Sequence, residues 1–289
     1  MEKRKIKKIV TLGMALLMVA GMAGCGGNDT ADGGAKDITV ISREEGSGTR
    51  DAFVELTGVL EDDVDRTVDT AEISNSTSVV TQSVAGNESA IGYISMGSMS
   101  EEVKALKVNG VDADVDNVKS GDYELQRPFN IVTKGELKEL PQDFVDFIMS
   151  ADGQAIIEAE GYIAVEDDAE QYQSKGLEGT ITVAGSTSVA PVMEVLADKY
   201  KELNKGVTIE IQQTGSGAGI QSTIEGVCDI GMASRELNDD EEAKGLDSEE
   251  IALDGIAVIV NTANKVEDIT MDQLKNIFIG QITNWSELQ

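Results

Sequence analysis

The chain has 289 residues, of which 23 are basic and 53 acidic, and its formal net charge is −30 at pH 7. A charge of this sign and size argues against a nucleic-acid partner. The chain contains no histidine. This excludes Ser-His-Asp and Cys-His catalytic pairs and removes the commonest metal ligand, so we expect no metal and no cofactor.

Residues 1–24 have the features of a secretory signal. Five basic residues among the first eight precede an apolar run over 9–23 that is short for a membrane-spanning helix. The run ends in Met22-Ala23-Gly24-Cys25, which resembles a bacterial lipobox. We therefore expect lipidation of Cys25 and attachment to the extracytoplasmic face of the cell membrane, with a cleaved but unlipidated signal as the alternative. Residues 25–36 are predicted to form a flexible tether.

The segment 37–56 predicts a strand that runs into a helix. Alternating apolar residues over 38–42 favour the strand, and Ala52, Phe53 and Leu56 have the spacing of a helix. The turn between them, Arg43-Glu44-Glu45-Gly46-Ser47-Gly48-Thr49, puts backbone N–H groups, hydroxyls and a helix N-terminus in one place. That combination is the chemistry of an anion site.

Two arginines bracket this turn, at positions 43 and 50. A guanidinium offers planar, paired donors that match the oxygens of an oxyanion. The alternative for this stretch alone is an ordinary capped turn with two solvated arginines.

Downstream, Asn75-Ser76-Thr77-Ser78 begins a predicted helix that ends near Gly86, and 90–95 has the pattern of a buried strand. The break at Met96-Gly97-Ser98 is predicted to be a crossing between lobes. Further elements follow up to a polar segment at 166–177, which we predict to be a linker. They are a hairpin at 103–111, a strand at 127–133, and helices around 144–148 and 155–157.

The second part of the chain repeats the pattern of strand, glycine-and-hydroxyl turn and helix. One copy has its turn at 185–188 and another at 214–219, and Asp229–Arg235 is a further candidate. Strands and helices that alternate in this way predict an α/β architecture with ligands held where the helices begin. Cys228 is predicted to be a small buried apolar residue. A strand at 251–260, interrupted at Asp254-Gly255, and a helix at 271–278 complete the predicted elements.

Other nucleotide or phosphate motifs fit poorly. Gly215-x-Gly217 lacks the third glycine of the dinucleotide fingerprint, and no Gly-x-x-x-x-Gly-Lys-Ser/Thr is present. Three turns that converge on one cavity could instead surround an oxyanion with hydroxyls and N–H groups.

The stretches 42–53, 179–191 and 214–235 resemble the signature stretches of the substrate-binding lipoproteins of bacterial phosphate ABC transporters. The resemblance implies a two-lobed α/β fold of the periplasmic-binding-protein type (type II), with a ligand cleft between the lobes. It also implies non-catalytic binding of inorganic phosphate and delivery to the membrane permease and ATPase subunits of a transporter.

By position, the resemblance assigns phosphate-binding roles to three turns and to the fourth candidate. The family often has an Asp near Ser234 that accepts the phosphate proton, and here Ser234-Arg235 occupies that region. Asp254 or Glu45 are candidates for that role, each with a structural alternative such as pairing of Glu45 with Arg43. The assigned residues are Arg43, Ser47, Gly48, Thr49, Thr187, Ser188, Ser216 and Ser234, with Arg50, Ser186, Arg235 and Asp254 as additional candidates.

The order of the stretches differs from that of the family, in which the part resembling 179–288 comes first. The chain therefore resembles a circular permutant whose old ends are joined through 166–177. On this interpretation one lobe covers 98–260, and the other combines 37–97 with 261–289. The alternative is a fusion of two broken halves.

Three other functions compete with phosphate capture. A binder of another tetrahedral oxyanion such as sulfate would differ in lacking a buried proton-accepting carboxylate. A phosphate-ester hydrolase is disfavoured by the lack of histidine and of a clustered carboxylate metal motif, so we expect no enzyme. A surface sensor or adhesin would bind anions weakly or not at all.

Overall fold

The computed structural model describes residues 37–166 and 168–288. The predicted signal, the tether and Cys25 lie outside these residues. None of the helices in the described part has the length and hydropathy needed to span a bilayer.

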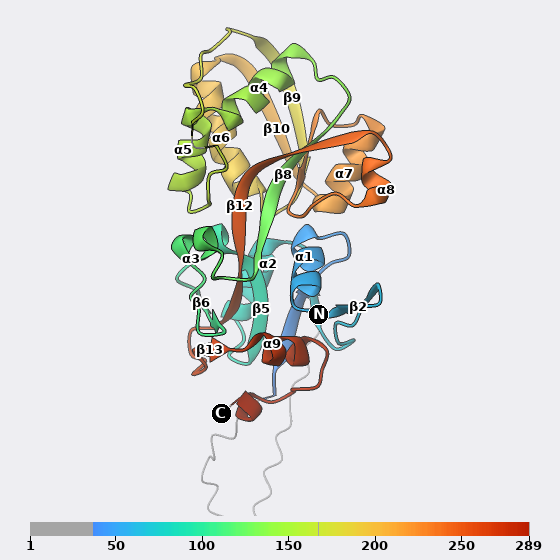
Figure 1. Cartoon of the computed structure of the whole chain (residues 1–289), viewed down its shortest axis with the longest axis vertical. Helices are drawn as coiled ribbons and strands as arrows, with labels where there is room; N and C mark the ends of the chain where they lie inside the picture. Colours follow the sequence, from blue (N-terminus) through green and yellow to red (C-terminus); the bar gives the residue numbers. More distant parts are fainter. Residues whose placement is uncertain (1–36, 167, 289) are drawn as a thin grey trace, which may run out of the picture. The chain divides into compact units, whose positions relative to one another are not determined.

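In the described part of the chain, nine strands form one mixed sheet (Figure 1). The order is β10-β9-β11-β8-β12-β5-β1-β4, and the short strand β6 also pairs with β12. The strands are β1 (Thr39–Arg43), β4 (Glu72–Ser74), β5 (Ala90–Ser95), β6 (Val103–Ala105), β8 (Gln126–Lys134), β9 (Glu178–Gly185), β10 (Gly206–Gln213), β11 (Ile230–Ala233) and β12 (Leu246–Asn261).

The long strand β12 joins two halves of this sheet. It pairs with β8 over Leu246–Gly255 and with β5 over Ile256–Val260, both antiparallel. We call residues 126–255 the β9 half, and residues 37–125 with 256–288 the β1 half. Because β12 runs unbroken through both halves, the predicted interruption of this strand at Asp254-Gly255 is wrong, and its register shifts instead between Glu250 and Ala252.

The structure also differs from the sequence prediction at 96–98, the predicted crossing between lobes, and in the residues that follow. Met96–Ser98 is a short 3-10 helix, η1, after which β6 pairs with β12 at Ile259–Asn261, still in the β1 half. Val118, Tyr123 and other apolar residues of 103–125 pack with the core of that half rather than with the lobe predicted for them. The chain passes between the halves at β8 and β12 instead.

The predicted hairpin at 103–111 is wrong in its pairing. Strand β6 pairs with β12, whereas β7 (Lys107–Val108) pairs in parallel with β13 (Asp268–Ile269). The tight turn itself is present, since Asn109 and Gly110 have φ angles of 53° and 81°. A turn signal is local, but the partners of the two strands come from residues 150 or more positions away.

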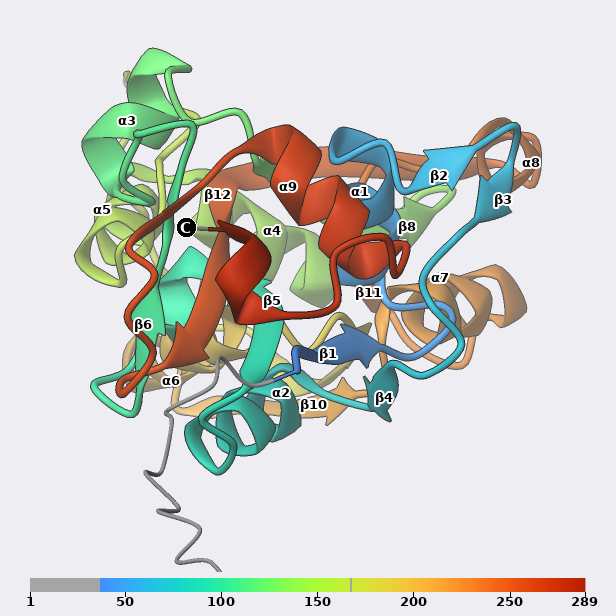
Figure 2. The ribbon, with the colours of Figure 1, turned by 90° about the horizontal axis from the view of Figure 1, so that it is seen from below.

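Helices cover both faces of each half, and the predicted helices and their capping residues are present. Figure 2 shows α2 on one side of β1 and β5, with α1 and α9 on the other. In the β1 half the helices are α1 (Gly48–Leu56), α2 (Thr77–Ala85), α3 (Val115–Ser120), α9 (Met271–Phe278) and η2 (Trp285–Leu288), beside the ribbon β2 (Leu60–Glu61) and β3 (Val64–Asp65). In the β9 half they are α4 (Glu139–Met149), α5 (Ala151–Ala159), α6 (Ala190–Leu203), α7 (Ser216–Glu225) and α8 (Asp239–Glu242).

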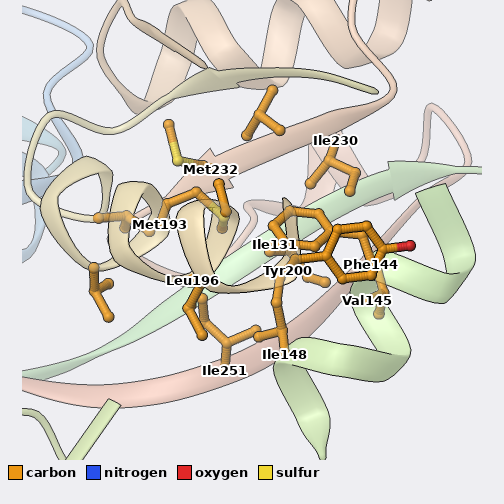
Figure 3. Close-up of a cluster of buried hydrophobic side chains, with 14 of the residues drawn as sticks. Ile131, Phe144, Val145, Ile148, Met193, Leu196, Tyr200, Ile230, Met232 and Ile251 are labelled. Atoms are coloured by element: carbon orange, nitrogen blue, oxygen red, sulfur yellow. The ribbon is translucent and has the colours of Figure 1, made fainter. Parts of the chain in front are cut away.

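Each half has its own apolar core. In the β9 half, Phe144, Leu196 and Ile251 belong to one cluster in which α4 and α6 pack on β8, β11 and β12 (Figure 3). In the β1 half, neighbouring residues of β1 enter different clusters: Val40 packs with Phe53 of α1, and Ile41 packs with Val80 of α2. This alternation is the pattern expected of a strand covered on both faces.

The predicted linker at 166–177 has no helix or strand among its described residues, yet it is tied to the β9 half. Tyr172 donates its hydroxyl to the buried carboxylate of Asp143 at 2.6 Å, and Tyr200 of α6 donates to the same oxygen at 2.7 Å. The Lys175 ammonium lies 2.9 Å from the other carboxylate oxygen. The linker is therefore anchored by a buried acid.

Candidate functional site

The turn between β1 and α1 has the predicted form. β1 ends at Arg43, Gly46 takes a positive φ of 81°, and Ser47 caps the helix by accepting a hydrogen bond from the backbone N–H of Arg50. Ser47 is buried, and its side chain serves this cap. Its hydroxyl thus fixes the first turn of α1, where the backbone N–H groups of Gly48 and Thr49 have no partner within the helix.

Hydroxyls from all the predicted turns meet in one buried network. Thr49 Oγ1 lies 2.8 Å from Ser188 Oγ, and Ser186 Oγ donates to Ser234 Oγ at 3.0 Å. The two pairs are joined because the backbone N–H of Ser188 donates to Ser186 Oγ. We call this network the hydroxyl cluster; its members are Thr49, Thr77, Ser186, Thr187, Ser188, Ser216 and Ser234, all of them buried.

Gly48 is the point of closest approach within the cluster. A Cβ at this position would lie 2.5 Å from Ser216 Oγ and 2.8 Å from Ser234 Oγ. Ser216 Oγ in turn lies 3.3 Å from Ser234 Oγ. A glycine is required here because the backbone of α1 comes directly against the two hydroxyls of the other half.

Arg43 brings the positive charge. Its side chain is only 2% exposed, and its guanidinium donates to Thr187 Oγ1 at 3.1 Å and to Thr77 Oγ1 at 3.4 Å. Two further N–H groups bind the carboxylate of Glu44, each at 2.8 Å. The partner of Arg43 is thus Glu44, and the predicted alternative pairing with Glu45 is wrong by one residue.

The cluster is built jointly by the two halves of the sheet. Arg43, Thr49 and Thr77 come from the β1 half, whereas the serines and Thr187 come from the β9 half. A main-chain hydrogen bond also crosses between them, from the N–H of Gly217 to the carbonyl of Gly46 at 2.9 Å. Loss of contact between the halves would therefore take the cluster apart.

Four helices begin at this cluster, α1 at Gly48, α2 at Thr77, α6 at Ala190 and α7 at Ser216. The N-terminus of a helix offers unpaired N–H groups and the positive end of the helix dipole. Together with one buried guanidinium and hydroxyls that can donate or accept, these ends form a site for a small oxyanion.

Thr77 is a member of the cluster that sequence analysis did not assign. It begins α2, and its hydroxyl lies 3.2 Å from Thr187 Oγ1 and 3.1 Å from Ser188 Oγ. The signal was present, since strand β4 followed by Ser76-Thr77-Ser78 and a helix repeats the pattern of the other turns.

Arg127 was also missed. This buried residue of β8 lies opposite Asp254 of β12, and it donates to the backbone carbonyl of Ser234 at 3.2 Å. Sequence analysis gave no signal for it, because a lone arginine in a strand pattern carries no spacing that points to a site.

Two of the additional candidates lie outside the cluster. Arg50 pairs with Asp65 at 2.8 Å and donates to the Arg43 carbonyl. Arg235 bridges Asp51 of α1 at 2.9 Å and Glu241 of α8 at 2.8 Å. Hydrogen bonds and charge from Glu241 raise the pKa of Arg235, so this guanidinium stays charged and engaged with carboxylates.

Asp254 has no exposed surface and is linked to the cluster through Arg127, which donates to the Ser234 carbonyl. Its carboxylate accepts from Arg127 at 3.2 Å and from Ser95 Oγ at 2.9 Å. Burial raises the pKa of Asp254 to about 6, although the charge of Arg127 and these hydrogen bonds oppose the shift.

No metal site or reactive thiol emerges from residues 37–166 and 168–288. No group of three Cys, Asp or Glu side chains there is placed to hold an ion. Cys228 is buried as predicted, and burial raises the pKa of its thiol. Its hydroxyl neighbour Thr223 belongs to α7, away from the cluster.

A cavity of about 490 Å³ opens beside the cluster. Thr77 and Thr187 belong to both, and the remaining lining is mostly hydroxyl and amide side chains. The cluster is thus reached through polar surface that both halves contribute.

The chain matches the family model described as the PBP superfamily domain over residues 6–152 and 170–289. It is 48% identical to "Phosphate-binding protein PstS 2" of Streptococcus agalactiae serotype V, over 100% of this chain and 99% of that protein. It is 38% identical to "Phosphate-binding protein PstS" of Bacillus subtilis, but over 38% of this chain and 37% of that protein.

A solved structure covers most of the fold. The crystal structure of a phosphate ABC transporter, phosphate-binding protein from Streptococcus pneumoniae TIGR4 shares 48% of its sequence with this chain and superposes with a TM-score of 0.71. The match covers 88% of this chain and 100% of that one. The predicted two-lobed α/β fold is confirmed, and the chain belongs to the PstS family of phosphate-binding proteins within the PBP superfamily.

Proposed function

We propose that this protein captures inorganic phosphate outside the cytoplasmic membrane and delivers it to a phosphate ABC transporter. The observation that carries the proposal is the hydroxyl cluster, in which buried hydroxyls, four helix N-termini and the Arg43 guanidinium converge from both halves. The same groups supply donors around a tetrahedral anion on several sides. Streptococcal relatives that carry the name of phosphate-binding protein support the choice of ligand.

The ligand is held by local donors and not by the overall charge. The chain has a net charge of −30, so its long-range field repels anions. Buried hydrogen bonds and one guanidinium in a low dielectric must outweigh this repulsion. Binding is reversible and non-catalytic, because the site supplies donors for an anion and no activated nucleophile.

We assign the direct contacts to Arg43, Thr49 and the other hydroxyls of the cluster, together with the backbone N–H group of Gly48. Thr77 joins them, whereas Arg50 and Arg235 bind Asp65 and Asp51 and, unlike Arg43, do not donate to a cluster hydroxyl. Ser47 contributes through the α1 cap.

Residues 1–25 support an exported, membrane-anchored protein. The basic start, the short apolar run and the Ala-Gly-Cys sequence fit cleavage before Cys25 and attachment of a lipid to its thiol. A protein held in this way at the extracytoplasmic face can pass its ligand to permease and ATPase subunits in the same membrane.

The order of the two parts fits a circular permutation. The S. agalactiae relative matches this chain from end to end, whereas the B. subtilis protein matches about two-fifths of it. A permuted order predicts such a partial match, because one part at a time stays collinear with an unpermuted relative. Permutation is tolerated where the new ends lie at the surface.

The proposal is tested by calorimetric titration of the purified chain with phosphate and, separately, with sulfate. We expect phosphate to bind and Arg43→Met to weaken it by about 100-fold to 1,000-fold, because the variant removes a buried charge that binds the anion. Arg66→Met is the matched control, since Arg66 is an exposed arginine of the same half that pairs with Glu61.

The contribution of Thr77 is tested with a matched pair of variants. Thr77→Val removes a cluster hydroxyl and should weaken phosphate by about 10-fold. Thr57→Val, at the end of α1, removes a buried hydroxyl that donates to the Phe53 carbonyl away from the cavity, and it should leave affinity unchanged. Tighter binding of sulfate than phosphate would instead establish the alternative ligand, and no binding of either would leave a sensor or adhesin.

A further inference from the structure

We propose that Asp254 is a positioning residue that couples anion capture to proton uptake, acting through Arg127 on the Ser234 carbonyl beside the hydroxyl cluster. The inference rests on the proposed function, because it concerns the same anion site. It assigns to Asp254 a proton taken from solvent, and no contact with the anion itself.

The geometry places Asp254 and Arg127 directly against each other. They are opposed residues on the paired strands β12 and β8. Arg127 donates through Nε at 3.3 Å and through Nη2 at 3.2 Å to one carboxylate oxygen of Asp254. Its third donor, Nη1, binds the Ser234 carbonyl. One guanidinium thus spans the distance from the buried acid to a cluster residue.

The pair also fastens the two halves together. The second carboxylate oxygen of Asp254 accepts from Ser95 at the end of β5, in the β1 half. Ser234, in contrast, ends β11 in the β9 half. A change in the charge of Asp254 therefore alters hydrogen bonds between the two halves, which must stay together to hold an anion.

The charged and titratable groups around Asp254 are few. Arg127 faces it from β8, and Tyr123 and Tyr162 lie close enough for the Asp254 charge to help raise the pKa of each phenol. Tyr123 is held by donating to the Ile256 carbonyl at 2.8 Å. Burial lowers the pKa of Arg127, and repulsion from Arg43 adds to this shift. Two buried guanidiniums therefore share this region of the protein.

An anion in the cluster changes this balance in one direction. It stabilises both guanidiniums and repels the carboxylate, and a nearby like charge favours the protonated form of an acid. Asp254, whose pKa already stands at about 6 through burial, would have that pKa raised further. Protonation of Asp254 removes its negative charge, so that the positive charge of Arg127 is less neutralised and attracts the anion more strongly. By linkage, proton and anion each strengthen the binding of the other.

The test is calorimetric titration of the full chain with inorganic phosphate at pH 6.5, in two buffers of different ionisation enthalpy. The difference in heat gives the protons taken up per anion. An acid with a pKa of about 6 is about three-quarters ionised at this pH. We expect the unmodified chain to take up about half a proton more per phosphate than Asp254→Asn. Proton changes of the phosphate itself cancel in this comparison.

Asp143→Asn is the matched control, because Asp143 is equally buried but lies in the core of the β9 half; it should keep the full uptake. If Asp254→Asn does not fold, Ser95→Ala supplies the test, since loss of one donor to the carboxylate moves the maximum of proton uptake to higher pH. Equal uptake in the unmodified and Asp254→Asn chains, or an unmoved maximum in Ser95→Ala, would overturn the coupling while phosphate binding stands. Absence of phosphate binding in the unmodified chain would overturn the proposed function and the coupling with it.

Discussion

Two aspartates with no exposed surface, Asp143 and Asp254, respond to burial in opposite ways. Burial works to raise the pKa of both. At Asp143 the hydrogen bonds from Tyr172, Lys175 and Tyr200 outweigh burial, and the pKa is lowered. At Asp254 burial prevails over Arg127 and Ser95, and the pKa rises to about 6.

The difference lies in where the partners stand. One donor to Asp143 is Lys175 of the linker, whose side chain is half exposed. The charge of this buried acid is therefore balanced by a cation that keeps contact with water. Asp254 is paired with a guanidinium that is itself buried and that also binds the Ser234 carbonyl. A buried acid whose only cation is itself buried remains costly to ionise, whereas one bound by several donors that include a half-exposed lysine is stabilised in its charged form. The arrangement at Asp254 suits an acid that changes its charge, whereas the arrangement at Asp143 suits an acid that stays charged and stabilises the fold.

The largest expected effect comes from breaking the Asp254 pair outright. Asp254→Ala leaves the Arg127 guanidinium buried without its carboxylate, and we expect the free energy of unfolding to fall by about 3–5 kcal/mol. Denaturant unfolding at pH 7 measures this. Asp254→Ala combined with Arg127→Met should recover much of the loss, and a double variant no more stable than the single one would contradict this explanation.

The next effect is on the pH dependence of stability. Because the folded pKa of Asp254 lies above its unfolded value, the folded chain binds more protons, and stability falls as the pH rises through about 4 to 6. This pKa shift of Asp254 changes the free energy of unfolding by about 3 kcal/mol across that pH range. Stability curves measured from pH 4 to 7 should be flatter in Asp254→Asn; a curve of unchanged slope would count against the raised pKa.

Asp143 should behave in the reverse sense. Its folded pKa is lowered, so its contribution is present above the unfolded pKa and is lost as the pH falls through the folded one. Asp143→Asn should cost about 2 kcal/mol at pH 7 and progressively less in acid. Thermal melting across this range would show it, while phosphate affinity stays as in the unmodified chain. A cost that grew in acid would rule out the assignment.

The smallest effect concerns a single donor to Asp143. Tyr172→Phe removes one hydroxyl and should destabilise the fold by about 1 kcal/mol. The linker should loosen locally, so limited proteolysis at 166–177 should become faster. Tyr123→Phe is a useful comparison, because it likewise removes a tyrosine hydroxyl that donates to a buried acceptor, but in the β1 half. Equal protection of the linker in both variants would show that Tyr172 does not anchor it.

Sequence analysis predicted the turns of the cluster because their signal is local. Gly46, Ser47 and Gly48 lie within three positions, and backbone freedom, capping and helix start all follow from neighbouring residues. The pairing of Arg43 with Glu44 and not Glu45 depended on side-chain direction, which the order of residues alone does not specify.

The junction between the halves was not predictable in the same way. Arg127 and Asp254 are 127 positions apart and meet only because β8 and β12 pair. The division at residue 98 failed for a similar reason, since β6 joins the edge of a strand that lies more than 150 residues further along the chain. Long-range pairing leaves no mark in the periodicity of either strand.

The hydrogen bond from Gly217 to the Gly46 carbonyl has a consequence for how this fold can diversify. Since both of its atoms are main chain, exchange of the surrounding hydroxyls for other side chains leaves it in place, and only the loss of an N–H, as in a proline at 217, removes it. Ligand preference can therefore change through side-chain replacement, while this main-chain contact between the two halves is kept.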